Sequence, residues 1–480
     1  MIRPRRQFSK FALAAGAIAL SSGCMMGPNY ERPAVTAPAA FAHETAAAAA
    51  TADTTWWNQF KDPVLDQLIL EGLAHNSDIA IAAANVDNLS AVLLQTRSQL
   101  FPQPGYGVSG QGQRGALPTT VYNATLSASW ELDLWGRIRR QSESAFANVL
   151  ASDEARRGVV LSLVATIADS YLQLCGLDAQ LAVAKRTLST YKDSVALFTL
   201  QYQYGQVSQM NVAQAQSQYE TAAAQIPVIE TQIGQLENAL AVLVGRDPGP
   251  ITRGKSVDEL ILPPVPQGLP SDLLERRPDL LQAEQQLISA NAQIGAAKAL
   301  YFPKISLTGV LGTASTDLTD LFKGSARVWT YAGSLAGPIF TFGAISGQVA
   351  QAEAAQNSAL LSYQLAIRNA FSDVDNALIA NQQLQVQLAA QVRLVAALKQ
   401  YTDLANLQFV GGYTSYTTVL QAEQSLFPAE LSLAGLRAQL LTSSVNTYKA
   451  MGGGWVTQAD RLTTPVPKSP PTLPTRPPLF

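Results

Sequence analysis

The sequence is poor in charge, histidine and cysteine. Only 14% of its 480 residues are charged, against about 25% in ordinary soluble domains. Two histidines, His43 and His75, cannot form a multi-histidine metal site, and two cysteines exclude a disulfide framework. The net charge of −2 gives no electrostatic reason to bind nucleic acid. Phosphate-binding glycine loops, nucleophile elbows and metalloprotease motifs are missing. We therefore predict a protein that is not an enzyme and needs no cofactor or metal.

The amino terminus has the pattern of a secretory signal. Basic residues within the first ten positions precede an apolar run over 11–20, which is too short to span a bilayer. The following Ser21-Ser22-Gly23-Cys24 resembles a bacterial lipobox, which predicts a signal peptide over 1–23 and a lipid on Cys24. Methionines rather than an aspartate follow this cysteine, and by resemblance to lipoprotein sorting rules this favours the outer membrane. The alternative is an ordinary signal peptide with an incidental cysteine.

An internal repeat organises the rest of the chain. Phe101-Pro102 recurs as Phe302-Pro303, 201 positions later, and beyond that point the offset is 207, so that Gly205 corresponds to Gly412. A single duplication of this size indicates two copies of one large structural unit rather than a solenoid of short repeats. The predicted order is a lipid anchor and linker, a first repeat, an inter-repeat linker, a second repeat and a proline-rich tail, over 24–60, 61–250, 251–270, 271–455 and 456–480.

Each copy contains one very long predicted helix. Residues 137–204 and 345–410 lack proline and contain few glycines, and at 1.5 Å per residue each helix would be about 100 Å long. Apolar residues recur every seven positions, as in Val160, Ile167 and Leu174 of the first helix. This spacing indicates coiled-coil packing. A dimeric coiled coil is the alternative to a helical wall.

Shorter helices accompany the long ones. A glycine turn after each long helix predicts a returning helix, over 207–244 and 415–450, because glycine is the preferred residue where a helix ends in a left-handed turn. Pro227 and Pro428 fall inside these returns, where we expect kinks. Two further helices, over 63–100 and 271–300, precede the Phe-Pro sites.

The segments between the Phe-Pro sites and the long helices have the periodicity of strands. Over 121–134 every second residue is apolar and the residues between are nearly all polar, which predicts a strand with one apolar and one polar face. Segments 106–113, 304–313 and 328–342 alternate less strictly. No internal run reaches about 18 apolar residues, so a membrane crossing would require a closed β-barrel. Four strands cannot close one alone, because the smallest barrels have eight, but three copies would supply twelve.

Several motifs resemble those of one family. The runs GCMMGPNYERP (23–33), WWNQFKDPVLD (56–66), WELDLWGR (130–137) and LPSDLLERRPDL (269–280) resemble TolC-like outer-membrane efflux proteins, specifically NodT-type lipoproteins. The resemblance extends from about residue 24 to 454. It implies an α+β membrane protein: a homotrimer with a 12-stranded β-barrel, four strands per chain, and a long α-helical coiled-coil tunnel in the periplasm.

The resemblance also implies roles for the two hairpin tips. Residues of both tips would contact a periplasmic membrane-fusion adaptor: Gly205, Val207, Ser208, Gly411, Gly412, Tyr413 and Ser415. An entrance gate would lie beside them, at Asn211, Phe409, Thr414, Thr418 and Gln421. Better-known relatives carry charged residues at this entrance, whereas none of these five is charged. Because neutral hydrogen bonds have about half the strength of charge-assisted ones, we predict a weakly latched entrance closed by packing around Phe409 and Tyr413.

The predicted function is an exit duct. By resemblance the protein would conduct drugs or other small toxic molecules passively across the outer membrane of a Gram-negative bacterium. Its partners would be a periplasmic adaptor and an inner-membrane resistance-nodulation-division (RND) transporter, together with membrane lipid. Two alternatives are the duct of an ABC-driven type I export system and a lipid-anchored periplasmic coiled-coil scaffold without a pore. The alternating strand over 121–134 favours a duct, since a scaffold needs no lipid-facing surface.

Overall fold

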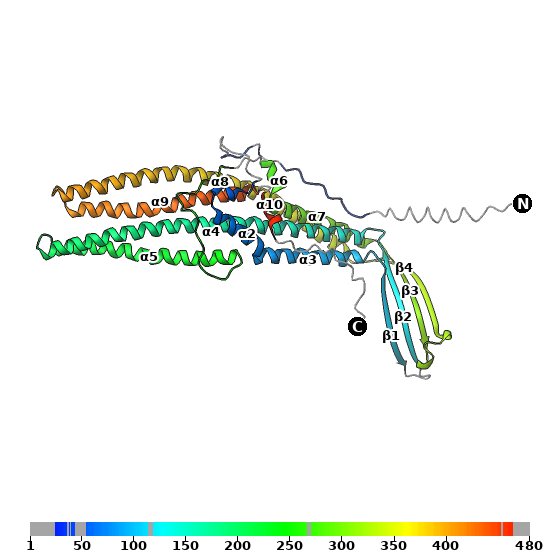
Figure 1. The fold of residues 1–480 in the computed structure, drawn as a ribbon. Helices are drawn as coiled ribbons and strands as arrows, with labels where there is room; N and C mark the ends of the chain where they lie inside the picture. Colours follow the sequence, from blue (N-terminus) through cyan, green and yellow to red (C-terminus); the bar gives the residue numbers. More distant parts are fainter. Residues whose placement is uncertain are drawn as a thin grey trace.

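The protein is a long helical bundle with a β-sheet at one end (Figure 1). The computed structural model describes residues 25–35, 38, 40–43, 54–113, 119–265, 270–452 and 455–463. The predicted signal peptide and lipid-bearing Cys24 lie outside this part of the chain, as does most of the predicted proline-rich tail. The turns of both helical hairpins lie at the end of the bundle farthest from the sheet (Figure 1).

The described residues form four strands in one antiparallel sheet. The strands are β1 (Gln103–Gln113), β2 (Thr119–Leu132), β3 (Lys304–Ser315) and β4 (Arg327–Ala336), and they pair in the order β1-β2-β3-β4. The two repeats thus contribute two strands each. β4 was expected to continue to residue 342. It ends at Ala336 because Gly337-Pro338 follows and proline cannot donate a hydrogen bond to the neighbouring strand.

The register places the apolar residues of the sheet on one face. Tyr106 pairs with Leu126, Leu126 with Leu311, and Leu311 with Trp329, which forms an apolar row across all the strands. Side chains of this row are exposed to solvent in the single chain. The adjacent row, which includes Ser127 and points to the other face, is mostly small or polar. The strict alternation predicted for β2 is therefore confirmed, and the sheet has one face suited to lipid and one suited to water.

The long helices match their prediction closely. α4 (Arg137–Gln203) and α8 (Ala344–Val410) have 67 residues each. Each begins after a glycine in a left-handed conformation, Gly136 with φ 76° and Gly343 with φ 91°. Glycine adopts this conformation without steric cost, so it can turn the chain sharply from strand to helix.

The returning helices are α5 (Gln209–Leu243) and α9 (Tyr416–Met451). Both helices continue without a break through Pro227 and Pro428, where kinks are predicted. α5 packs against α4, while α9 packs against both α8 and α4. The contact between α4 and α9 therefore joins the first hairpin to the second.

The two helices predicted before the Phe-Pro sites are each divided. The first is α2 (Pro63–His75) and α3 (Ser77–Ser98), because the side chain of Asn76 accepts hydrogen bonds from the backbone N–H groups of Asp78 and Ile79 and begins a new helix. The second is α6 (Leu273–Arg276) and α7 (Pro278–Lys298). It breaks at Arg277, since a residue before proline disfavours helical geometry.

Two helical stretches are long and apolar enough to cross a membrane when judged by length and composition alone, Pro63–Ser98 and Arg137–Gln203. The first is the stretch broken at Asn76. The most apolar window of the second is 67% buried against the rest of the protein. Packing within the bundle therefore explains the apolar residues of the second stretch, whereas the most apolar window of the first is only 17% buried.

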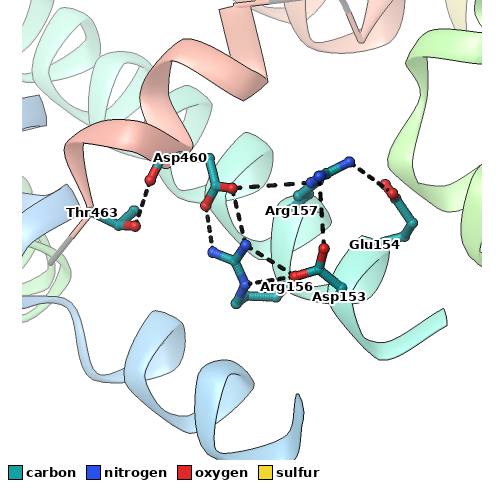
Figure 2. A network of polar contacts seen from close by, with 6 residues as sticks. All are labelled: Asp153, Glu154, Arg156, Arg157, Asp460 and Thr463. Carbon is teal, nitrogen blue, oxygen red and sulfur yellow. Dashed lines mark hydrogen bonds and ion pairs between the residues drawn. The ribbon is translucent and has the colours of Figure 1, made fainter. Parts of the chain in front are cut away.

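The main core lies in the middle of the bundle and includes a helix that the sequence did not predict. The proline-rich tail was expected from residue 456, but α10 (Trp455–Leu462) packs here, with the buried ring of Trp455 against Trp56 and Trp57. Figure 2 shows a polar network that holds the same helix to α4, in which Asp460 binds Arg156. The first residues of the predicted tail, up to Leu462, are therefore helical.

Candidate functional site: the two hairpin tips

Both long helices end in the same backbone turn. At the first tip Gly205 N–H donates to the carbonyl of Tyr202, and Gln206 N–H to that of Gln201. At the second tip Gly412 N–H donates to Phe409, and Tyr413 N–H to Gln408. These pairs are Schellman motifs, with the glycine at φ 68° and 79° respectively.

The glycine turns predicted from the sequence are therefore confirmed, at positions 207 residues apart. Gly411 differs from its neighbour Gly412, since its φ of −74° is open to any residue. The left-handed conformation that requires glycine is found at Gly412 alone of these two.

The polar residues predicted for the entrance bond within their own tips. The Ser208 hydroxyl donates to the side-chain oxygen of Asn211 at 2.9 Å, where α5 begins. The hydroxyls of Thr414 and Thr418 lie 2.8 Å apart across the first turn of α9, which follows Ser415. The Gln421 side chain is exposed. Within the single chain these neutral groups hold each tip in shape and do not bridge one tip to the other.

Aromatic packing does connect the two hairpins. We call Phe198, Phe409 and Tyr416 the tip cluster. Their ring centroids lie 4.0 Å apart for Phe198 and Tyr416, 5.5 Å for Phe409 and Tyr416, and 6.0 Å for Phe198 and Phe409. Phe198 belongs to α4 and the others to the second hairpin. Val207 of the first tip packs against the same cluster.

Of the two residues around which packing was predicted, only Phe409 lies in this cluster in the single chain, and the entrance gate itself stays a prediction. The Tyr413 side chain is 87% exposed, and Tyr416 packs against Phe409. Sequence reasoning missed Tyr416 although it lies one residue past the start of the predicted returning helix.

The ends of the tips present exposed apolar side chains. Tyr204 and Met210 lie at or just past the first tip, and Leu407, Val410 and Tyr413 at the second. Exposed apolar groups that gather at one end of a molecule are typical of a surface that binds another protein.

The first carboxylate beyond the second tip is Glu423 of α9. The side chain is buried, and its Oε2 atom has no hydrogen-bond partner among the described residues. Burial raises the pKa of Glu423 to about 7. In the described chain no group of three or more histidine, cysteine or acidic residues is placed to hold a metal ion.

At the membrane end, the segment that follows Cys24 is bound firmly to the bundle. Met26 N–H donates to the carbonyl of Trp135 at 3.1 Å, beside the junction of strand and helix. The buried guanidinium of Arg140 donates to the carbonyls of Met26 and Gly27 and to the side chain of Asn29. This contact fixes the chain within a few residues of position 24.

Comparison with known proteins identifies the family. Residues 68–246 and 269–453 match the outer membrane efflux protein family. The probable efflux pump outer membrane protein TtgC of Pseudomonas putida is 36% identical over 469 residues, which cover 94% of this chain and 96% of TtgC. The cation efflux system protein CusC of Escherichia coli is 35% identical over 449 residues, 92% of this chain and 97% of CusC.

Solved structures agree with these matches. The open state of the MtrE outer membrane channel of Neisseria gonorrhoeae superposes with a TM-score of 0.83 at 33% identity, over 90% of this chain and 99% of MtrE. A structure of CusC gives a TM-score of 0.81 at 34% identity, over 90% of this chain and all of that one. The chain therefore belongs to the outer membrane efflux protein family, and it has the fold of that family's outer-membrane channels.

Proposed function

We propose that the protein forms a homotrimer that acts as the passive exit duct of a tripartite efflux pump. The observation that carries the proposal is the open sheet: within the described residues, β1 and β4 each pair along one side only. An open sheet edge in hydrocarbon would leave backbone groups without hydrogen bonds. Three copies of the four strands would give a closed barrel of twelve, with the apolar row of Tyr106 and Leu126 facing lipid.

A lipid on Cys24 would anchor the duct beside its barrel. The contacts of Met26 with Trp135 and Arg140 support this proposal, because they hold Met26, two positions after Cys24, near the end of β2. Acyl chains attached there would enter the membrane next to the barrel wall rather than at the end of a long linker.

The tips would form the periplasmic entrance and receive the adaptor. Exposed Tyr204, Val410 and Tyr413 would contact the adaptor, together with the backbone of the two glycine turns. The residues Asn211, Phe409, Thr414, Thr418 and Gln421 would form or flank the gate. An inner-membrane RND transporter would supply the energy and select the drugs or other small toxic molecules, so the duct itself needs no chemistry.

Electron microscopy of the detergent-extracted full-length protein tests the assembly. Threefold particles well over about 100 Å long, with a barrel at one end, are expected from helices of this length. Monomers or two-stranded rods would contradict the proposal and favour the scaffold without a pore. Copurification with an ABC exporter in place of an RND transporter would instead support the type I export alternative.

A further inference from the structure

The seam between the two hairpins contains one buried carboxyl group. Glu423 lies two turns into α9 and is 9% exposed. Tyr416 lies two helical turns before it on the same side of α9, and Phe427 follows one turn after it. From α4, the hydroxyl of Tyr191 donates to the backbone carbonyl of Glu423 at 3.4 Å. Both tyrosines are themselves buried, so the carboxyl group is enclosed where the first hairpin meets the second.

No cation compensates this carboxyl group within the described residues. Lys192 and Asp193, next to Tyr191 on α4, are exposed, and so is Asp403 of α8. Lys399 of α8 instead binds Glu430, two turns further along α9, at 2.9 Å. Arg186 of α4 approaches the same Glu430 at 3.4 Å. Tyr191 and Tyr416 are therefore the titratable groups that face Glu423, and burial raises the pKa of both, which keeps them neutral.

A buried carboxylate without a cation is strongly unfavourable, so the packed seam favours the protonated form. If α4 and α9 separate, water reaches Glu423 and its pKa returns towards the ordinary value of 4.5 from about 7. The packed seam thus holds a proton that the separated seam releases to water. Below about 4.5 both states hold it and pH has no effect. Between pH 4.5 and pH 7, rising pH destabilises the packed seam relative to the separated one. Above pH 7 a further rise has no additional effect.

We propose that Glu423 is a proton-linked latch of the periplasmic entrance: protonated, it keeps α9 packed on α4, and loss of its proton favours separation of the two hairpins. This latch rests on the proposed function of the protein as a duct, and it would regulate the opening of the duct's entrance. It differs from a gate held by ion pairs, which acid would weaken by protonating the carboxylates. In the proposed latch, acid instead strengthens closure of the entrance, because it keeps Glu423 protonated.

Single-channel recording tests the latch. The full-length protein is purified in detergent, reconstituted in planar bilayers and recorded at pH 5, 6, 7 and 8. We expect the ratio of closed to open states to fall by about tenfold or more between pH 5 and pH 8. Glu423→Gln, a neutral side chain of the same shape, should keep the low-pH behaviour throughout. Glu220→Gln is the matched control, because Glu220 is an exposed carboxylate of α5 bonded to Gln216, and it should behave like the unmodified protein.

The outcomes of these recordings distinguish a failure of the proposed latch from a failure of the proposed duct. A conducting channel whose closure does not change with pH, or a Glu423→Gln channel that keeps the change, overturns the latch and leaves the duct intact. A protein that never conducts overturns the proposed duct and the latch with it.

Thiol labelling gives a readout that does not depend on Glu423→Gln folding. Ala422→Cys places a thiol at a fully buried position beside Glu423, and Ser425→Cys places one on an exposed part of the same helix. The ratio of their labelling rates cancels the intrinsic pH dependence of thiol chemistry. We expect the ratio to rise from pH 5 to pH 8, and a constant ratio would overturn the latch.

Discussion

The two long helices have the same length, and both begin and end beside glycine turns, but side chains at equivalent positions make different contacts. Leu174 of α4 and Asn381 of α8 occupy equivalent positions, 207 residues apart, and both are buried. Leu174 joins the main apolar core. The amide of Asn381 instead donates to the hydroxyls of Ser443 and Ser444 on α9. The duplication therefore preserved the backbone while the interior diverged.

The neighbours of each helix account for this difference. α4 packs against helices from both repeats, including α2, α3, α7 and α9, whereas α8 packs mainly against α7 and α9. Separating apolar contacts such as those of Leu174 costs free energy, because water does not replace the lost contacts. Polar contacts such as those of Asn381 can exchange with water at small net cost. At these equivalent positions the first hairpin is therefore held by apolar packing and the second by polar contacts.

Leu174→Ala should give the largest effect and sharpen this contrast. Removing a fully buried leucine leaves a cavity and should lower the free energy of unfolding by about 3 kcal/mol. Thermal unfolding of the detergent-solubilised protein measures the loss. Leu197→Ala, at a half-exposed position on the same helix, is the control and should cost less than about 0.5 kcal/mol. Equal losses of unfolding free energy in the two variants would mean that burial of Leu174 does not stabilise the middle of α4.

Asn381→Ala tests the equivalent position of the second hairpin. It removes the bonds to Ser443 and Ser444 and the one that Gln385 donates to Asn381, and should cost about 2 kcal/mol. Gln382→Ala, an exposed neighbour, should be neutral. A loss larger than that of Leu174→Ala in the same unfolding experiment would mean that the polar contacts of Asn381 hold the second hairpin more firmly than apolar packing holds the first.

Phe409→Ala should loosen the entrance without unfolding the protein. It removes two aromatic contacts of the tip cluster, each worth about 0.5–1.5 kcal/mol, so the open state should gain roughly tenfold. Single-channel recordings measure this gain. Tyr413→Ala provides the comparison, because its exposed side chain should leave the isolated channel unchanged. Unchanged closed-state conductance of Phe409→Ala would exclude the tip cluster as part of the gate.

Gly412→Ala should give the smallest effect. A side chain in the left-handed conformation of this residue should cost about 1 kcal/mol. Gly234→Ala is a control of opposite sign: it lies inside α5 with open space around it, and alanine favours a helix over glycine. Melting temperatures of the two variants should therefore shift in opposite directions.

Much of the fold followed from local patterns. The lack of proline and scarcity of glycine predicted α4 and α8 to within one residue, alternation predicted β2, and glycine predicted both tips. The division at Asn76 was missed because it depends on one capping side chain inside an otherwise helical pattern. α10 was missed because its stability comes from Trp56 and Trp57, almost 400 residues earlier in the chain.

In the candidate site too, some features follow from neighbouring residues in the sequence, and others depend on residues far away in the chain. The sequence indicated Phe409 and the glycine turns, but it did not indicate that Tyr416 packs against Phe409. In the sequence, Glu423 is only the first carboxylate beyond the second tip. Whether that group is solvated or enclosed depends on Tyr191 of α4, which is 232 residues away.

The sequence by itself therefore determined the lengths of the long helices, the alternation of β2 and the conformation of the turns, because these depend on residues within a few positions of each other. The tertiary structure alone decided which residues are buried. Equivalent positions of the two repeats, such as 174 and 381, have the same local backbone and different neighbours. Burial, and with it the protonation of Glu423, depends on the elements packed against a side chain, and these come from distant parts of the chain.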